Sequence, residues 1–208
     1  MTSFSRRAFV TAMAACVVAG CGGGHDAPEP QRSGATGPPG TRAPAVGSSV
    51  DGPRPLARSV PVGLEIPAIG VDTPVMRLGL APDRTVEVPP ITADDQAGWY
   101  RHSPTPGQRG PSVVLGHVTV GSYGDGVFRH LARLRRGDGI TVRLENGTVA
   151  RFAVTSVRTV AKADFPTEAV YGDVDRPELR LITCGGPLEG DEYRDNVIVF
   201  AALNATTP

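Results

Sequence analysis

The sequence has few of the residues from which metal and cofactor sites are usually built. Its 208 residues include three cysteines, four histidines and a single lysine, Lys162. The cysteines and histidines show no zinc-binding spacing, and the glycine-rich stretch of residues 121–126 has no clear helix after it, as a phosphate-binding loop requires. The formal net charge is zero, which gives no indication of nucleic acid as a partner. We therefore expect no metal, no cofactor and no nucleic-acid binding.

The sequence also lacks an apolar run long enough to cross a membrane as a helix. The uncharged stretch of residues 8–20, which follows Arg6 and Arg7, has 13 residues, whereas a spanning helix needs about 20. A short apolar run behind a positive charge is typical of a signal peptide. The adjacent arginines resemble a twin-arginine export signal, and general secretion is the alternative.

Residues 18–21, Val-Ala-Gly-Cys, resemble a bacterial lipobox. The resemblance implies cleavage before Cys21 and a diacylglycerol on its thiol, which would hold the protein on the outer face of the cell membrane. Cys16 would then be discarded with the signal peptide of residues 1–21. Ordinary cleavage nearby, or a segment retained as an anchor, are the alternatives.

The next segment, residues 22–58, is rich in proline and glycine and has almost no large apolar side chains. Such a segment buries too little surface to offset the entropy of ordering it, so we expect a disordered tether. The remaining residues, 59–204, are enough for one domain with one hydrophobic core.

Within residues 59–204, the apolar segments are short, β-branched and separated by Gly, Pro and Asp, which favours strands over helices. The sequence Glu145-Asn146-Gly147 between two alternating segments indicates a hairpin. About eight strands at this spacing predict an all-β domain, an antiparallel barrel or a sandwich. The expected strands are residues 64–69, 73–78, 86–88, 112–118, 139–144, 149–157, 178–183 and 196–202, with short helices at 92–98 and 127–134.

Cys184 is the most informative residue, because it would be the free thiol of the mature chain. It follows the apolar run of residues 179–183 and precedes two glycines, so we expect it at the end of a strand. An unpaired thiol in an oxidising compartment is a liability unless it has chemistry to do. His117 ends another apolar run and could activate the thiol. Arg194, just before the last strand, could stabilise an oxyanion. A core histidine and a solvated loop arginine are the alternative interpretations.

These residues, in this order, resemble a sortase. The resemblance rests on Leu115-Gly116-His117, on residues 181–184 (Leu-Ile-Thr-Cys), and on Arg194 before a β-branched closing strand, and it covers about residues 60–204. Cys184-Gly185-Gly186 and Tyr193-Arg194-Asp195-Asn196 are most similar to actinobacterial class F. The resemblance implies an eight-stranded β-barrel with short helices.

The same resemblance implies a cysteine transpeptidase that cleaves an LPxTG-like sorting signal and passes the acyl group to an amine of a cell-wall precursor. Cys184 would attack the Thr–Gly bond, His117 would transfer protons, and Arg194 would bind substrate and stabilise the oxyanion. Thr183 would help to position the substrate. In many sortases the arginine lies nearer to the final strand, at the place of Asn196, which makes Asn196 the competing position.

Other functions remain open from the sequence. Papain-like peptidases place cysteine before histidine, the reverse of this chain, and L,D-transpeptidases have a different sequence before the cysteine. A sortase-like hydrolase, with water in place of the amine, is an alternative. A non-catalytic, lipid-tethered domain that binds wall polymer is another. The sorting motif, the acceptor and the oligomeric state cannot be read from the sequence.

Overall fold

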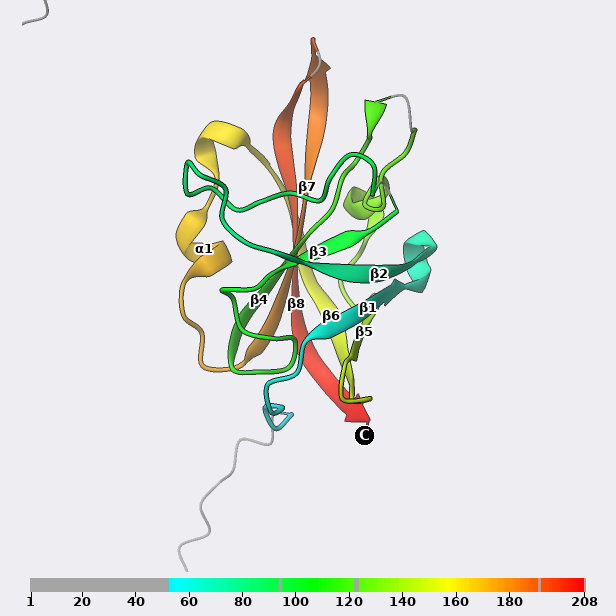
Figure 1. The fold of residues 1–208 in the computed structure, drawn as a ribbon, viewed down its shortest axis with the longest axis vertical. Coiled ribbons are helices and arrows are strands. Elements are labelled where there is room, and N and C mark those ends of the chain that lie inside the picture. The colour runs from blue at the N-terminus through cyan, green and yellow to red at the C-terminus, as the bar shows by residue number, and fades with distance from the viewer. Residues whose placement is uncertain (1–52, 94, 122–123, 191, 208) are drawn as a thin grey trace, which may run out of the picture. The chain divides into compact units, whose positions relative to one another are not determined.

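Short β-branched segments fold into a closed barrel of eight strands in the described part of the chain (Figure 1). The computed structural model describes residues 53–93, 95–121, 124–190 and 192–207. The strands are β1 (Pro61–Ile66), β2 (Val71–Leu78), β3 (Ala97–Tyr100), β4 (Gly110–Leu115), β5 (Gly139–Leu144), β6 (Val149–Ala161), β7 (Pro177–Glu189) and β8 (Glu192–Thr207). They close in the order β1-β2-β3-β4-β7-β8-β6-β5. The expected eight-stranded β-barrel is confirmed.

The sequence had predicted antiparallel strands, but the barrel contains both parallel and antiparallel pairs. β2 pairs with β3 and β4 pairs with β7 in parallel, while the other neighbours are antiparallel. Parallel neighbours need a crossover instead of a tight turn. The β2–β3 crossover, residues 79–96, is therefore long, and the chain between β4 and β7 includes the two strands β5 and β6.

The barrel interior is filled by the inward-facing residues, which alternate with outward-facing ones along each strand. β5 shows the pattern most plainly, since Ile140, Val142 and Leu144 are buried while the residues between them are more exposed. Trp99, Phe128 and Phe152 are the largest fully buried side chains. At about 25 cal/mol per Å² of apolar surface removed from water, this interior is the main stabilising term of the fold.

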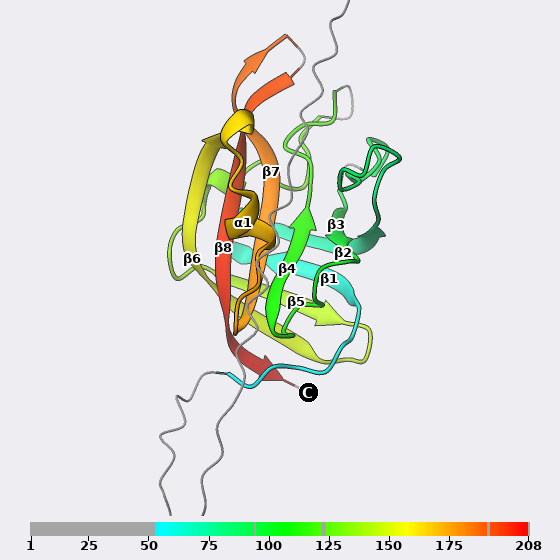
Figure 2. The ribbon, with the colours of Figure 1, turned by 90° about the vertical axis from the view of Figure 1, so that its left-hand side faces the viewer.

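A second apolar cluster lies on the outer face of β4, β7 and β8. It contains Val113, Ile182, Ile198 and Phe200, and it is covered by the short helix α1 (Thr167–Tyr171), whose Val170 is fully buried. Figure 2 shows α1 in front of β7 and β8. The sequence analysis missed this helix, because one five-residue turn leaves no helical periodicity to detect.

A charged pair is buried at the edge of this outer cluster. The guanidinium of Arg180, 2% exposed, donates to a carboxylate oxygen of Glu178 at 2.5 Å and to the carbonyl oxygen of Ala169 in α1 at 3.2 Å. It also lies over the ring of Phe200, 4.6 Å from the centroid. Arg176 donates to the second carboxylate oxygen of Glu178. Both charges are thus compensated where they lose water.

The strand limits differ from the expected ones mainly at the end of the chain. β7 and β8 extend well beyond residues 178–183 and 196–202, and they form a ribbon that projects from the barrel (Figure 1). Cys184 therefore lies within β7, and its expected place at a strand end is wrong. Residues 86–88 form only an isolated bridge from Val86 to Leu80.

The expected short helices also differ. The helix expected at 127–134 is reduced to the 3₁₀ turn η3 (Leu131–Arg133), and the one at 92–98 gives way to turns and the start of β3. Two further 3₁₀ turns, η1 (Pro67–Ile69) and η4 (Lys162–Asp164), follow β1 and β6.

The barrel's contacts begin earlier than the expected boundary at residue 59. The backbone N–H of Leu56 donates to the carbonyl of Gly107 at 2.8 Å, and its side chain packs against the core. The guanidinium of Arg58 lies over the ring of Trp99. The expected signal peptide of residues 1–21 and the expected tether up to residue 52 lie outside the described residues. In the described part, none of the helices combines the length and apolarity needed to cross a membrane.

Candidate active site

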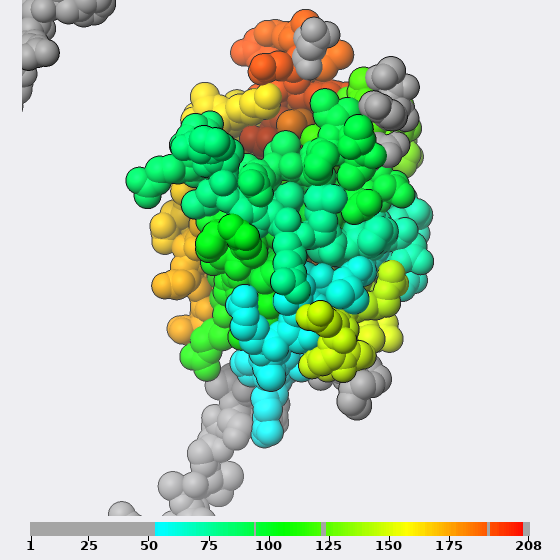
Figure 3. All heavy atoms as spheres, in the orientation of Figure 1, coloured from blue at the N-terminus to red at the C-terminus, as the bar shows by residue number. Residues whose placement is uncertain are grey.

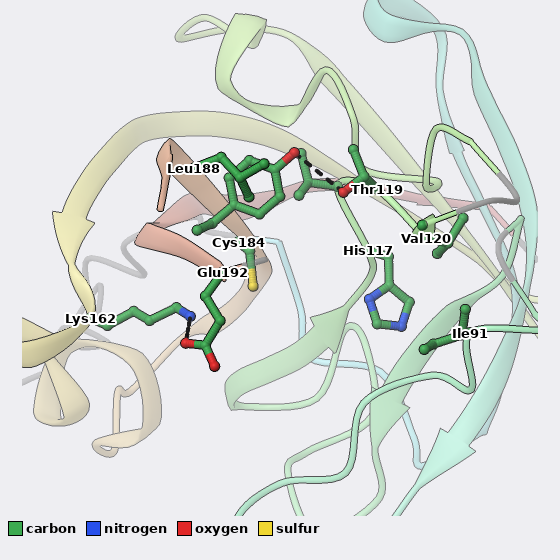
Figure 4. A pocket seen from close by; sticks show the side chains of 11 residues that line it. Ile91, His117, Thr119, Val120, Lys162, Cys184, Leu188 and Glu192 are labelled. Carbon is green, nitrogen blue, oxygen red and sulfur yellow. Dashed lines mark hydrogen bonds and ion pairs between the residues drawn. The ribbon is translucent and has the colours of Figure 1, made fainter. Parts of the chain in front are cut away.

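A pocket of about 750 Å³ opens at the end of the barrel from which β7 and β8 project, and it contains both Cys184 and His117. Its walls are otherwise mostly apolar, with Ile91, Val120 and Leu188 among the residues that line it. Figure 4 shows the sulfur of Cys184 pointing into the space between His117 and a charged pair on the opposite side. The structure thus brings together two of the three residues that the sequence assigned to catalysis.

The position of Cys184 follows from its pairing in the sheet. It lies opposite Asn196 of β8, one pair beyond Thr183 and Val197 and two pairs beyond Ile182 and Ile198. Side chains alternate along a strand, so Cys184 shares the outer face with Ile182. The thiol is half-buried and, among the described residues, free.

The two glycines after Cys184 allow the strand to bend just past the thiol. The register shifts between Gly185 and Leu188, which is a β-bulge. Gly186 has φ +73°, and a Cβ there would lie 2.1 Å from a carboxylate oxygen of Asp195. Only glycine fits this close approach, which explains locally why Gly185-Gly186 follows the cysteine.

His117 comes two residues after β4 and is fixed by backbone contacts on both sides. The N–H of Gly116 donates to the carbonyl of Ile182 in β7 at 3.1 Å, which continues the β4–β7 alignment toward Cys184. The N–H of Phe128 donates to the carbonyl of His117 at 2.9 Å. A Cβ on Gly126 would lie 2.4 Å from that carbonyl oxygen, so the chain returning past His117 needs glycine there.

The imidazole is oriented by the β2–β3 crossover, which the sequence analysis did not implicate. Nε2 lies 2.6 Å from the carbonyl oxygen of Pro89. A carbonyl can only accept, so Nε2 carries the hydrogen and the neutral ring has its lone pair on Nδ1. Nδ1 is on the side of the ring that faces Cys184 in Figure 4. This arrangement leaves Nδ1 able to exchange a proton with the thiol or with a substrate amine.

The Pro89-Pro90 sequence could have signalled a rigid segment. Proline fixes its own φ, and a proline that follows confines the preceding residue to extended conformations. In the space-filling view of Figure 3 the β2–β3 segment lies across the upper part of the face below the projecting tip of β7 and β8. The sequence predicts that this segment is stiff, but it does not predict where the segment lies on the barrel.

Arg194 is not among the described residues that line the Cys184 pocket. Alternation along β8 puts it on the same face as Asn196 and Cys184. Its guanidinium, however, donates to a carboxylate oxygen of Glu189 at 2.5 Å, in a neighbouring hollow of about 400 Å³. Both side chains are more than half exposed, so the pair contributes little and is easily exchanged for another partner.

Thr183 also lies outside the pocket lining. It is 4% exposed, and its hydroxyl has no hydrogen-bond partner in the described residues. As the neighbour of Cys184 along β7, it faces the barrel interior.

A charged pair stands opposite His117 in the pocket. The ammonium of Lys162 lies 3.6 Å from a carboxylate oxygen of Glu192. The sequence analysis assigned neither residue to the site. Lys162 directly follows β6, whose last residue, Ala161, pairs with Asp195 of β8, and this pairing brings the lysine beside the ribbon that carries Cys184. The pocket rim is closed by Tyr193, whose hydroxyl lies 3.3 Å from that of Thr119.

An aromatic group covers the outer cluster beside the site. The rings of Tyr100 and Tyr171 meet edge to face at 6.3 Å, and Phe165 lies beside Tyr171. Burial, and secondarily the neighbouring Tyr100, raise the pKa of Tyr171, so its hydroxyl stays neutral at physiological pH. Within the described ranges, no three His, Cys, Asp or Glu side chains are grouped closely enough to hold a metal ion.

Comparisons with known proteins agree with this geometry. The family model for the sortase domain matches residues 64–204. A search of curated proteins found no match. Among solved structures, the chain is similar to the SrtA sortase from Actinomyces oris, with 25% identity and a TM-score of 0.54 over 73% of this chain and 84% of that one.

Two further structures are similar at lower identity. Sortase A from Listeria monocytogenes has 18% identity and a TM-score of 0.53, over 71% of this chain and 89% of that one. A Clostridium perfringens sortase D5 transpeptidase has 20% identity and a TM-score of 0.52, over 71% and 79%.

Proposed function

Because the chain belongs to the sortase family, whose members are cysteine transpeptidases of the cell surface, we propose that it cuts an LPxTG-like sorting signal and joins the acyl part to an amine. The observation that carries this proposal is the shared pocket of Cys184 and His117, with Nδ1 of the imidazole facing the thiol. We place the chain in the actinobacterial class F, on the residues that flank Cys184 and Arg194.

The proposed reaction has two halves. The Cys184 thiolate attacks the carbonyl carbon of the scissile Thr–Gly bond, the C–N bond breaks, and His117 protonates the leaving amine. The acyl group is then a thioester on Cys184. His117 takes a proton from the incoming amine, whose nitrogen attacks the thioester carbon, and the C–S bond breaks to return the thiolate.

The other predicted site residues support this chemistry in different ways. We propose that Arg194 leaves Glu189 to bind the sorting signal, since it lies on the face of Cys184 and its present ion pair is exposed. A backbone amide next to Cys184 would donate to the oxyanion. Thr183 would act through its backbone, which sets the position of Cys184, because its side chain faces inward.

We also propose the cellular setting that the N-terminal sequence indicates. The signal peptide of residues 1–21 would be cleaved, Cys21 would carry the lipid, and a tether would hold the catalytic domain outside the membrane. The partners would be proteins with LPxTG-like sorting signals and an amine of a cell-wall precursor.

The test is cleavage of a pentapeptide library, with products identified by mass spectrometry in the presence and absence of diaminopimelate-containing amines. We expect an LPxTG-type peptide to be cut and joined to the amine. Cys184→Ala should abolish both steps while its circular dichroism spectrum stays that of the wild type. Cleavage retained by Cys184→Ala would refute the mechanism.

The alternatives give different results in the same experiment. Products joined only to water would identify a sortase-like hydrolase. No cleavage, together with alkylation of Cys184 by iodoacetamide no faster than a model thiol and unaffected by His117→Ala, would identify a wall-binding domain.

A further inference from the structure

The Cys184 pocket contains a cation that the proposed mechanism has not used. Of the described residues that line it, Lys162 is the only lysine or arginine. Arg194, the cation expected there, lines the neighbouring hollow beside Glu189, whereas Lys162 and Glu192 line both hollows. Lys162 is therefore the cation within the described lining of the Cys184 pocket.

The placement of Lys162 relative to the imidazole suits one part of the tetrahedral intermediate. In Figure 4, His117 lies on one side of the sulfur, and Lys162 with Glu192 lies on the other. The leaving nitrogen must point toward His117, because it takes its proton from the ring. The oxyanion occupies a different vertex of the same carbon, away from the imidazole. A cation across the sulfur from His117 is therefore on the side away from the amine, where it can reach the oxyanion.

The resting partner of Lys162 does not hold it strongly. The side chains of Lys162 and Glu192 are 41% and 85% exposed, and the atoms of the pair are 3.6 Å apart. An exposed pair of this kind contributes little to stability, so the ammonium can turn from Glu192 to a substrate oxygen at small cost. The ammonium is a compact charge on a flexible stem, which allows this movement.

From these contacts we infer that Lys162 is a further catalytic residue: its ammonium stabilises the oxyanion that forms when Cys184 is acylated, and Glu192 is its weak partner in the free enzyme. The inference rests on the proposed function. It also gives the two cations different roles, because Arg194 then binds the donor peptide and Lys162 acts in the transition state. No bond to Lys162 is made or broken.

The experiment is single-turnover acylation of Cys184 by an LPxTG-type peptide, measured by rapid quench and mass spectrometry. Lys162→Met should lower the acylation rate constant by about 100- to 1,000-fold, as loss of an oxyanion donor does, with the peptide KM changed less than about 3-fold. Lys162→Arg, which keeps the charge, should recover most of the rate. The control is Arg77→Met, which breaks a comparably exposed ion pair with Glu145 at a position far from Lys162 in the sequence. Its acylation rate should equal that of the wild type.

Glu192→Gln distinguishes the cation from the ion pair. It removes the competitor for the ammonium, so acylation should become about 2- to 5-fold faster, the factor that a weak exposed pair is worth. Acylation slowed as much as in Lys162→Met would show that the pair has a structural role and would overturn the inference.

The single lysine offers a direct reporter. Reductive ¹³C-methylation keeps the positive charge and gives one lysine signal, identified by its loss in Lys162→Arg. We expect this signal to shift when an LPxT-peptidyl chloromethyl ketone alkylates Cys184, and an unchanged signal would contradict contact with the bound carbonyl. If the wild type is acylated and Lys162→Met is acylated at the same rate, this inference alone is overturned. If the wild type forms no acyl-enzyme, the proposed function and this inference are overturned together.

Discussion

One residue step along β7 decides which side of the barrel wall a side chain faces. Cys184 faces the pocket, while Thr183, its neighbour, is buried on the other side. The same rule on β8 puts Arg194 and Asn196 on the face of Cys184. The sequence left open which of these two residues binds the substrate. Because both side chains face the same way, the length of each side chain and its hydrogen-bonding groups must decide between them.

We expect Arg194→Ala to lose about 10- to 100-fold in kcat/KM for the sorting peptide, mainly through KM, because a charged hydrogen bond to substrate is worth about 1.5–3 kcal/mol. Steady-state kinetics with the wild type and with Asn196→Ala measure this. Asn196 lies directly opposite Cys184 but carries no charge, so Asn196→Ala should lose less. The reverse order would assign the donor-binding role to Asn196.

At the scale of elements, β7 carries both the proposed nucleophile, Cys184, and a buried ion pair that fixes α1 to the sheet. Arg180 joins Glu178 within the strand to the carbonyl of Ala169 in the helix. Since α1 covers the outer cluster beside the pocket, this pair connects the barrel wall to the segment that follows Lys162. Its loss should affect stability more than chemistry.

We predict that Glu178→Gln lowers the free energy of unfolding by about 3 kcal/mol, because it leaves the guanidinium of Arg180 buried without its counter-charge. Urea unfolding at pH 7 measures the loss. The control is Glu65→Gln, which removes the 3.9 Å partner of Arg143 in a pair whose side chains are both more than 40% exposed. This substitution should change the free energy of unfolding little. An equal effect of the two substitutions would mean that burial does not matter at Glu178.

The same pair predicts how stability depends on pH. Burial by itself would raise the pKa of Glu178, but the hydrogen bonds and charges of Arg180 and Arg176 outweigh it and hold the pKa below its ordinary value of 4.5. A lowered folded-state pKa stabilises the protein above the unfolded value and is lost as the pH falls through the folded one. The stability difference between wild type and Glu178→Gln should therefore shrink below about pH 4.5.

For the whole molecule, the closed barrel is a rigid support for loops that come from distant parts of the sequence. The pocket combines residues of the β2–β3 crossover, of the segment after β4, of the end of β6 and of the β7–β8 ribbon. Each begins or ends at a strand of the barrel, so their relative positions depend on the barrel as a unit.

The anchoring of the whole molecule can be tested separately from catalysis. We expect Cys21→Ser to move the protein from the membrane fraction to the soluble fraction on detergent phase partition, because two acyl chains are needed for stable attachment. Cys16→Ser is the matched control and should stay with the membrane, since residue 16 would leave with the signal peptide. Retention of Cys21→Ser on the membrane would indicate a retained apolar anchor.

The sequence by itself determined the strand content of the barrel, and it singled out Cys184 and His117 as the proposed nucleophile and base. β-branched alternation and turn residues are local signals, and an unpaired thiol in a chain expected to be exported restricts the chemistry whatever its surroundings. Only the tertiary structure decided the parallel β2–β3 and β4–β7 pairs, the carbonyl of Pro89 on the imidazole, and the presence of Lys162 in place of Arg194 in the pocket. Those contacts join residues far apart along the chain, and no local preference encodes which distant partner a strand or side chain meets when the barrel closes.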